Sequence, residues 1–140
     1  MPTLTQLIRC SQAFERYSGA HVKQMGVTES QFDVIATLGN TDGMTCKELG
    51  EHTLITKGTL TGVLDRMELR QLIVRRSDAT DARRTHIALT GKGDALFNEV
   101  FPAHLEHLQR AFGHLSVSEL NHLREGLTTL RVAFEKELAR

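Results

Sequence analysis

Apolar residues recur every three or four positions through most of the chain, which is the spacing of helices that bury one face. The first such stretch runs from Leu4 toward a stop at Gly26. Three later stretches open with a capping box, in which threonine or serine is followed three residues on by glutamine or glutamate. These pairs are Thr28 with Gln31, Thr45 with Glu48, and Ser116 with Glu119. The pattern predicts a mainly α-helical chain whose second, third and last helices begin at these residues.

The stretch after Thr56 predicts a helix with two different faces. Gly58 and Gly62 stand on its open face, so small and polar residues crowd the first two turns. Apolar residues at positions i, i+3, i+4 and i+7 form the buried face: Leu60, Val63, Leu64 and Met67.

Two short apolar runs follow this helix and predict a two-stranded β-hairpin. Ile73 and Val74 are β-branched and form the first run. Residues 85–89 form the second run and place Ile87 and Leu89 on one side of a strand. The loop between the two strands is polar and basic.

The last third of the chain predicts two further helices. Thr90 can cap the first of them, and Pro102 inside it should bend or break the helix because proline lacks a backbone N–H. After Ser116, apolar residues step by three and four positions, as in a helix packed along another helix. One short helix cannot bury this many leucines against its own module, so a partner chain is expected to cover the leucine face. The expected dimer interface comprises Leu4, Leu7, Ile8, Leu120, Leu123, Leu127 and Leu130.

The positive charge is concentrated in one part of a neutral chain. The 140 residues carry 17 basic and 17 acidic side chains. Residues 56–92 hold eight basic and four acidic residues, a net charge of +4, and the remainder carries −4. A neutral protein with this asymmetry can still present a phosphate-seeking face.

Composition narrows the class of protein further. With 40% hydrophobic and 24% charged residues, the chain is typical of a soluble globular protein, and no apolar run reaches the roughly 18 residues of a membrane span. The first ten residues lack an apolar run of signal-peptide length, so a cytoplasmic location without a membrane partner is expected. Two cysteines are too few for a disulfide scaffold. There is no phosphate-binding loop, nucleophile elbow or metal-protease motif, so no enzyme activity, cofactor or metal is expected.

The order of helix, helix, short capped helix, longer helix and hairpin is that of a winged helix-turn-helix. The small, polar turns after Thr56 suit the major groove of duplex DNA, where base edges present distinguishable donors and acceptors. Arg83 and Arg84 near the hairpin tip suit the adjacent minor groove, whose negative potential attracts arginine. The chain is therefore expected to bind DNA.

Two segments carry a resemblance to a known family. Residues 64–68 read L-D-R-M-E, and residues 81–93 match D-x-R-x-x-x-I-x-L-T-x-x-G. Together they resemble the MarR family of bacterial transcriptional regulators, and the resemblance in length and helix order covers the whole chain. It implies a mainly α fold with a small β-hairpin wing, in a single domain over residues 1–140. Within it, a winged helix module at about 30–90 is flanked by dimerisation helices at about 3–25 and 91–138.

The same resemblance implies a homodimeric repressor that binds a pseudo-palindromic operator and is released by a small molecule or an oxidant. It assigns contacts to double-stranded DNA to Arg83 at the wing tip and to four residues of the recognition helix. Those four are Thr56, Lys57, Thr59 and Thr61. Asp81 matches the aspartate two residues before the wing arginine. Because an acid repels phosphate, its expected role is to orient Arg83 or to hold the loop.

Other residues of this region are interpreted structurally or depart from the family. Asp65 and Arg66 are interpreted as a scaffold pair rather than as base contacts. Gly62 stands where many members have a large, often basic residue, so one usual DNA contact is missing. Gln71 replaces the glycine common after the recognition helix. Thr53 stands where a larger apolar residue is usual, and the adjacent Leu54 is expected to compensate.

A dimer of this kind has a crevice between each winged module and the helical base, lined by the first, second and fifth helices. An apolar crevice with few polar groups suits a small aromatic acid or a phenol, with His21 or Arg16 to hold the acid. The candidate pocket residues are Phe14, Tyr17, His21, Phe32, Phe97 and Phe101.

Three alternatives remain open at this point. His104, His107 and His114 recur along one helix, so a metal-responsive regulator is one of them. Cys10 on the first helix offers redox control, and Cys46 lies just inside the third helix. The third alternative is a winged-helix module that binds a protein and not DNA.

Overall fold

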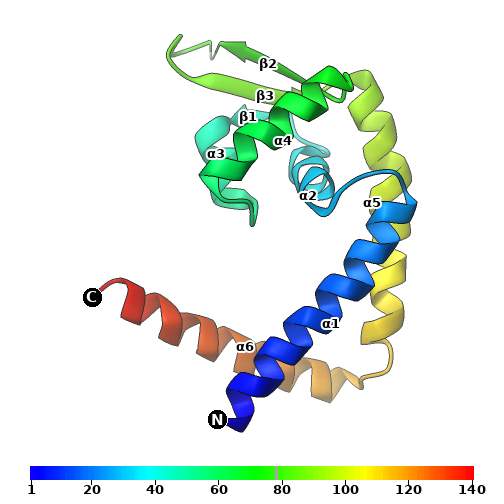
Figure 1. Ribbon diagram of the computed structural model, residues 1–140, viewed down its shortest axis with the longest axis vertical. Helices are drawn as coiled ribbons and strands as arrows, with labels where there is room; N and C mark the ends of the chain where they lie inside the picture. The colour runs from blue at the N-terminus through cyan, green and yellow to red at the C-terminus, as the bar shows by residue number, and fades with distance from the viewer. Residues whose placement is uncertain (78) are drawn as a thin grey trace. The chain divides into compact units, whose positions relative to one another are not determined.

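The computed structural model describes residues 1–77 and 79–140 of the chain (Figure 1). These residues form helices joined by short connections, together with a small antiparallel sheet. In chain order the elements are α1 (Pro2–Gln24), α2 (Glu29–Leu38), β1 (Met44–Thr45), α3 (Cys46–His52), α4 (Lys57–Leu69), β2 (Ile73–Ser77), β3 (Thr85–Leu89), α5 (Gly91–Phe112) and α6 (Val117–Leu138). The predicted mainly α fold with a β-hairpin wing is confirmed.

All three predicted capping boxes are present. At the start of α2, the backbone N–H of Gln31 donates to Thr28 Oγ1 at 3.1 Å, and the N–H of Thr28 donates to Gln31 Oε1 at 3.2 Å. The Thr45 and Glu48 pair opens α3 in the same way, and the Ser116 and Glu119 pair opens α6. Each box satisfies backbone donors that a helix start leaves without partners.

The sheet has three strands, so the prediction of a two-stranded hairpin was incomplete. Its strand order is β1-β3-β2, and both pairings are antiparallel. The added strand is Met44–Thr45, in which Met44 pairs with Ile87 of β3. A strand of two residues is too short to show an alternating pattern, and it follows Gly43, whose φ of +98° favours glycine.

Pro102 does not break α5, which continues from Gly91 to Phe112. The proline removes one backbone donor, and its own side chain is exposed. At the end of α4, Gln71 adopts φ of +60°, and its N–H donates to the carbonyl of Glu68. The tight exit turn therefore forms without the glycine common in the family.

The expectation that Leu54 compensates for Thr53 was wrong. Thr53 is buried, with 7% of its surface exposed, whereas Leu54 is 97% exposed. The backbone N–H of Leu54 donates to Oδ2 of Asp33 on α2 at 2.9 Å, which holds the turn between α3 and α4. The Oγ1 atom of Thr53 is buried and has no hydrogen-bond partner among the described residues.

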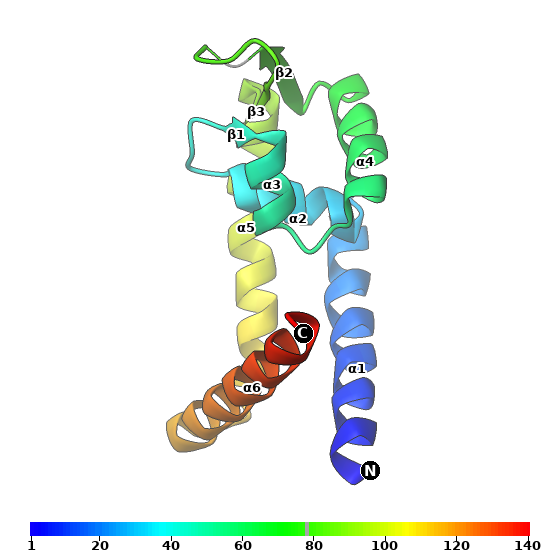
Figure 2. The same ribbon diagram turned by 90° about the vertical axis from the view of Figure 1, so that its left-hand side faces the viewer.

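The described residues form two compact units, Met1–His104 and Leu105–Arg140. The first unit contains the hydrophobic core, to which α2, α3, α4, the sheet and α5 all contribute. Its fully buried large side chains include Ile35, Leu38, Leu49, Leu64, Met67 and Ile87. Within this unit, the hairpin of β2 and β3 lies at the end far from the N-terminus of α1 (Figure 2). The division into a winged module and dimerisation helices stays a prediction.

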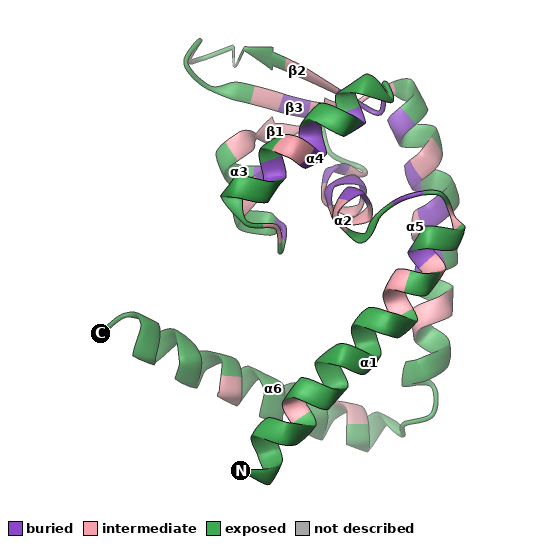
Figure 3. Cartoon of the chain, in the orientation of Figure 1, coloured by how far each residue is buried: buried purple, intermediate pink, exposed green. Residues whose placement is uncertain are grey.

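Helices α1 and α6 are exposed along most of their length (Figure 3), and both carry exposed large apolar side chains. In the first unit, α1 buries only Val22, while Leu4 and Ile8 are about half exposed. In the second unit, α6 has no buried residue, and Leu123 and Leu127 are 43% and 50% exposed. These surfaces include residues of the predicted dimer interface. Within residues 1–77 and 79–140, no helix is long and apolar enough to cross a membrane.

Candidate nucleic-acid interface

Helix α4 presents one face to the core and leaves its first turns open. The predicted buried face is correct, since Leu60, Val63, Leu64 and Met67 are all buried. Within the described residues the Thr56 side chain makes no capping hydrogen bond to the helix, and its hydroxyl instead donates to Thr59 Oγ1 at 3.1 Å. An uncapped helix start offers backbone N–H groups and a partial positive charge to an anion such as phosphate.

The four residues predicted to contact DNA from α4 lie together on these open turns. Thr56, Lys57, Thr59 and Thr61 are all exposed. Apart from its chain neighbours and the backbone of its own helix, no atom of the described residues lies within 4 Å of where a side-chain carbon would stand at Gly58. A base edge or sugar can therefore approach the helix backbone closely at this turn.

The wing is tied to α4 by one arginine of β2. Arg75 Nη2 donates to Asp65 Oδ1 at 2.6 Å, and its Nε donates to Glu68 Oε2 at 3.2 Å. These hydrogen bonds, first with Glu68 and then with Asp65, raise the pKa of Arg75 above its usual value. The two acids of α4 thereby bind a wing arginine. Asp65 was interpreted as the scaffold partner of Arg66, and that was wrong, because its partner is Arg75.

The wing residues expected to reach the minor groove project into solvent. The side chain of Arg83 is 94% exposed, and that of Arg84 is 65% exposed. Asp81 Oδ1 accepts the backbone N–H of Arg83 at 3.0 Å and lies 3.6 Å from Arg83 Nε. Asp81 thus contacts both the backbone and the side chain that it was expected to orient. That role in DNA binding stays a prediction, and Asp78 lies outside the described residues.

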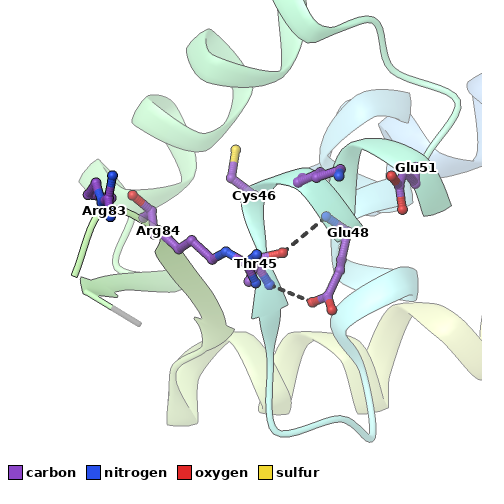
Figure 4. Close-up of a pocket in the computed structure, with 8 residues that line it drawn as sticks. Thr45, Cys46, Glu48, Glu51, Arg83 and Arg84 are labelled. Atoms are coloured by element: carbon purple, nitrogen blue, oxygen red, sulfur yellow. Dashed lines mark hydrogen bonds between the residues drawn. The ribbon is translucent and has the colours of Figure 1, made fainter. Parts of the chain in front are cut away.

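A hollow of about 530 Å³ lies between the start of α3 and the loop end of the wing, where β3 begins (Figure 4). Lys47 of α3 and Arg84 of the wing are among the cations that line it, and Glu48 is held by its capping bonds to Thr45. The backbone N–H of Thr45 donates to the Glu48 carboxylate and lowers its pKa, with a smaller effect from Arg84. The lining residues are Thr45, Cys46, Lys47, Glu48, Glu51, Arg83, Arg84 and Thr85. Sequence reasoning missed Lys47, whose only signal was its place in the first turn of α3.

The predicted ligand-pocket residues fall into separate groups. His21 Nδ1 lies 2.9 Å from Nδ1 of His104, whose ring also makes an edge contact with Phe32. Phe97 and Phe101 stack on each other with ring centroids 5.0 Å apart. Phe14 is 51% exposed and Tyr17 36% exposed. Sequence reasoning missed the central place of His104, which is 3% exposed.

The structure bears on the metal and redox alternatives as well. His104 Nε2 is hydrogen-bonded to Ser18 Oγ at 3.0 Å, so His104 contacts α1 through both ring nitrogens. In the part of the chain that the structure describes, no three His, Cys, Asp or Glu side chains are placed to hold a metal ion. Cys10 is exposed and Cys46 is half-buried, and both are free thiols.

Comparison with known proteins agrees with this geometry. The MarR family model matches residues 25–84. The homoprotocatechuate degradative operon repressor of Escherichia coli is 28% identical over 127 residues, which span 89% of this chain and 86% of the repressor. The crystal structure of the S. aureus MepR–DNA complex has a TM-score of 0.80 and 25% identity, and the match covers 94% of this chain and 96% of MepR.

A further structure concerns regulation of DNA binding by a small molecule. It is that of Bordetella bronchiseptica BpsR, whose DNA binding is regulated by 6-hydroxynicotinic acid. The TM-score is 0.81 with 25% identity, and the match covers 91% of each chain. The open first turns of α4 and the basic wing anchored to that helix agree with what these relatives are. The chain belongs to the MarR family of winged helix-turn-helix proteins and is a DNA-binding regulator of transcription.

Proposed function

We propose that this protein is a homodimeric repressor that places α4 in the major groove of an operator and Arg83 and Arg84 of the wing in the adjacent minor groove. The observation that carries the proposal is the anchoring of the wing to α4 by Arg75. Because one arginine joins the two elements, the helix and the wing reach DNA as a single surface. The proposed role is regulation in the cytoplasm rather than catalysis.

The relatives support repression at an operator. The E. coli relative is named as a repressor of an operon, and MepR was crystallised with DNA. In the proposed dimer, each protomer supplies one α4, and the two helices enter successive major grooves about 34–36 Å apart. This spacing requires a pseudo-palindromic site.

Fluorescence anisotropy with duplex DNA from the promoter beside its own gene tests the proposal. Binding should weaken steeply as salt rises, because Lys57, Arg83 and Arg84 displace counterions from phosphate. Arg83→Ala should weaken binding, whereas Arg131→Ala should not, because Arg131 lies on α6 and pairs with Glu135. Equal affinities for the two folded variants would exclude the wing contact, and failure to bind any duplex would exclude the proposed function.

The proposed dimer uses the exposed apolar faces of α1 and α6. Burying a leucine that is half exposed in the monomer contributes roughly 1 kcal/mol, and the dimer doubles each such contact. The flanking helices at about 3–25 and 91–138 would then act as the dimerisation part of the domain, and residues at about 30–90 as the winged module.

We further propose a small aromatic acid or phenol as the effector that releases DNA. BpsR, whose DNA binding responds to 6-hydroxynicotinic acid, supports this class of ligand. His21 is the proposed polar partner of the ligand, and Phe32, Phe97 and Phe101 are the proposed apolar ones. A ligand can act only through its different affinities for the two α4 spacings. Salicylate and 6-hydroxynicotinic acid at millimolar concentration should raise the melting temperature and release operator DNA, and failure of both effects would exclude this effector class.

A further inference from the structure

Arg66 is an exposed cation on α4. Among the residues that the structure describes, no hydrogen bond or ion pair engages its guanidinium, in contrast to Arg75, Arg83 and Arg84. The neighbours that a helix places beside residue 66 are Gly62, Val63, Leu69 and Arg70, and none is acidic. Asp65, the acid adjacent in sequence, is bound by Arg75 instead. The charge of Arg66 is therefore available to a partner outside the chain.

The side chain of Arg66 folds toward the open first turns of α4. At 100° per residue, Thr59, Gly62 and Arg66 share one flank of the helix, and Glu68 lies on nearly the opposite side from Arg66. The guanidinium lies close to Gly62, since a carbon added there would stand 3.5 Å from Nη1 and 3.9 Å from Nη2. Helical side chains lean toward the N-terminus in this way. The cation thus lies over the turn that enters the groove.

Gly62 leaves the space that the guanidinium uses. A large side chain at this position would occupy the surface over which Arg66 extends, whereas glycine leaves the helix backbone open there. The small residue at position 62 and the position of the Arg66 guanidinium one turn later are therefore linked. Arg66 thereby brings a planar, forked donor to the helix surface beside Gly62.

We propose that Arg66 reads a guanine in the major groove and determines operator specificity at one base pair of each half-site. A guanidinium donates two parallel hydrogen bonds to O6 and N7 of guanine, and no other base presents that pair of acceptors in the major groove. Glycine at position 62 allows the fork to lie flat against the helix while its donors point outward. This inference rests on the proposed entry of α4 into the groove.

The experiment selects binding sites from randomised duplex DNA with the full-length chain and with Arg66→Ala. The wild-type protein should recover a guanine at one position of each half-site, and Arg66→Ala should recover sites without that preference. Affinity for the wild-type site should fall by about fivefold to a hundredfold per half-site in Arg66→Ala, the range typical of a lost bidentate base contact. Arg131→Ala serves as the matched control and should recover the wild-type site.

Replacing the selected guanine by 7-deazaguanine removes its N7 acceptor and preserves base pairing. Wild-type affinity should fall by about tenfold, and the affinity of Arg66→Ala should not change. Gly62→Leu, which keeps Arg66 but fills its space, should also lose sensitivity to 7-deazaguanine. Leucine favours a helix more than glycine does, so this variant is expected to fold.

Two results would overturn the inference while leaving DNA binding in place. In one, Arg66→Ala weakens every duplex equally and keeps the wild-type base preference, which would make Arg66 a phosphate contact. In the other, sensitivity to 7-deazaguanine persists in Arg66→Ala, which would assign the guanine to another residue. If the wild-type protein binds no duplex at all, the proposed function itself fails.

Discussion

Arg75 on β2 donates a hydrogen bond of 2.6 Å to Asp65 on α4, and thereby joins the wing to the helix that we propose enters the major groove. Glu68, one turn further along α4, accepts from the same guanidinium. A raised pKa means that this contribution to stability is complete below the ordinary pKa of arginine. It is therefore fully present at neutral pH.

Removing the Arg75 side chain should weaken DNA binding more than it weakens folding. Arg75→Ala is expected to lower the free energy of unfolding by about 1 kcal/mol, because Asp65 and Glu68 are half exposed and solvent screens the pair. Operator affinity should fall further, since the wing arginines are then no longer held relative to α4. A double-mutant cycle of Arg75→Ala with Asp65→Ala measures the coupling. If the two changes are simply additive in both assays, the contact between Arg75 and Asp65 does not couple the wing to α4.

A charge on the apolar face of α6 should dissociate the proposed dimer. Leu127→Asp places a carboxylate where the leucine is 50% exposed in the single chain, and burying that charge between protomers is costly. Sedimentation should show a monomer at micromolar concentration and a loss of operator binding. Thr129→Asp adds the same charge two residues away on α6 and should leave the dimer intact. A wild-type protein that sediments as a folded monomer would refute the interface.

The capping glutamates predict an acid-sensitive fold. The backbone N–H of Thr45 lowers the pKa of Glu48, and that of Ser116 lowers the pKa of Glu119, from the ordinary value of 4.5. A lowered pKa gives stability that is present above pH 4.5 and is lost as the pH falls through the lowered value. The melting temperature should therefore decrease as the pH falls below about 4.5.

Glutamine at these two positions should keep the caps and remove part of this acid sensitivity. Gln31 already performs the same role opposite Thr28, so Glu48→Gln with Glu119→Gln preserves the hydrogen bonds. Glu48→Ala should instead destabilise the protein at every pH, because the cap itself is lost. If acid lowers the melting temperature of the double glutamine variant as much as that of the wild type, the prediction is contradicted.

Replacing Thr53 by valine should stabilise the protein. Thr53 is buried at the end of α3, and its hydroxyl has no partner among the described residues. Valine has nearly the same shape and no polar atom, so the free energy of unfolding should rise by about 1 kcal/mol in chemical denaturation. Thr53→Ser keeps the hydroxyl and loses a buried methyl group, and it should destabilise. Destabilisation by valine would mean that the hydroxyl is hydrogen-bonded in solution.

The sequence by itself determined the helices, their starting points and the two faces of α4. Capping boxes such as Thr28 with Gln31 join residues three positions apart, and the buried stripe from Leu60 to Met67 spans two turns of one helix. These interactions depend on the spacing along the chain, so the pattern of residue types is sufficient to predict them. The place of Arg83 at the exposed end of the wing followed from the same kind of local pattern.

Only the tertiary structure decided which residues meet across elements. Asp65 could pair with any nearby cation, and the packing of β2 against α4 makes Arg75 its partner instead of the adjacent Arg66. The partnership of His21 with His104 joins residues 83 positions apart, and the outward turn of Leu54 follows from a hydrogen bond to Asp33 on another helix. Residue types alone do not specify such contacts, because many pairings are chemically equivalent and the packing of the core selects one of them.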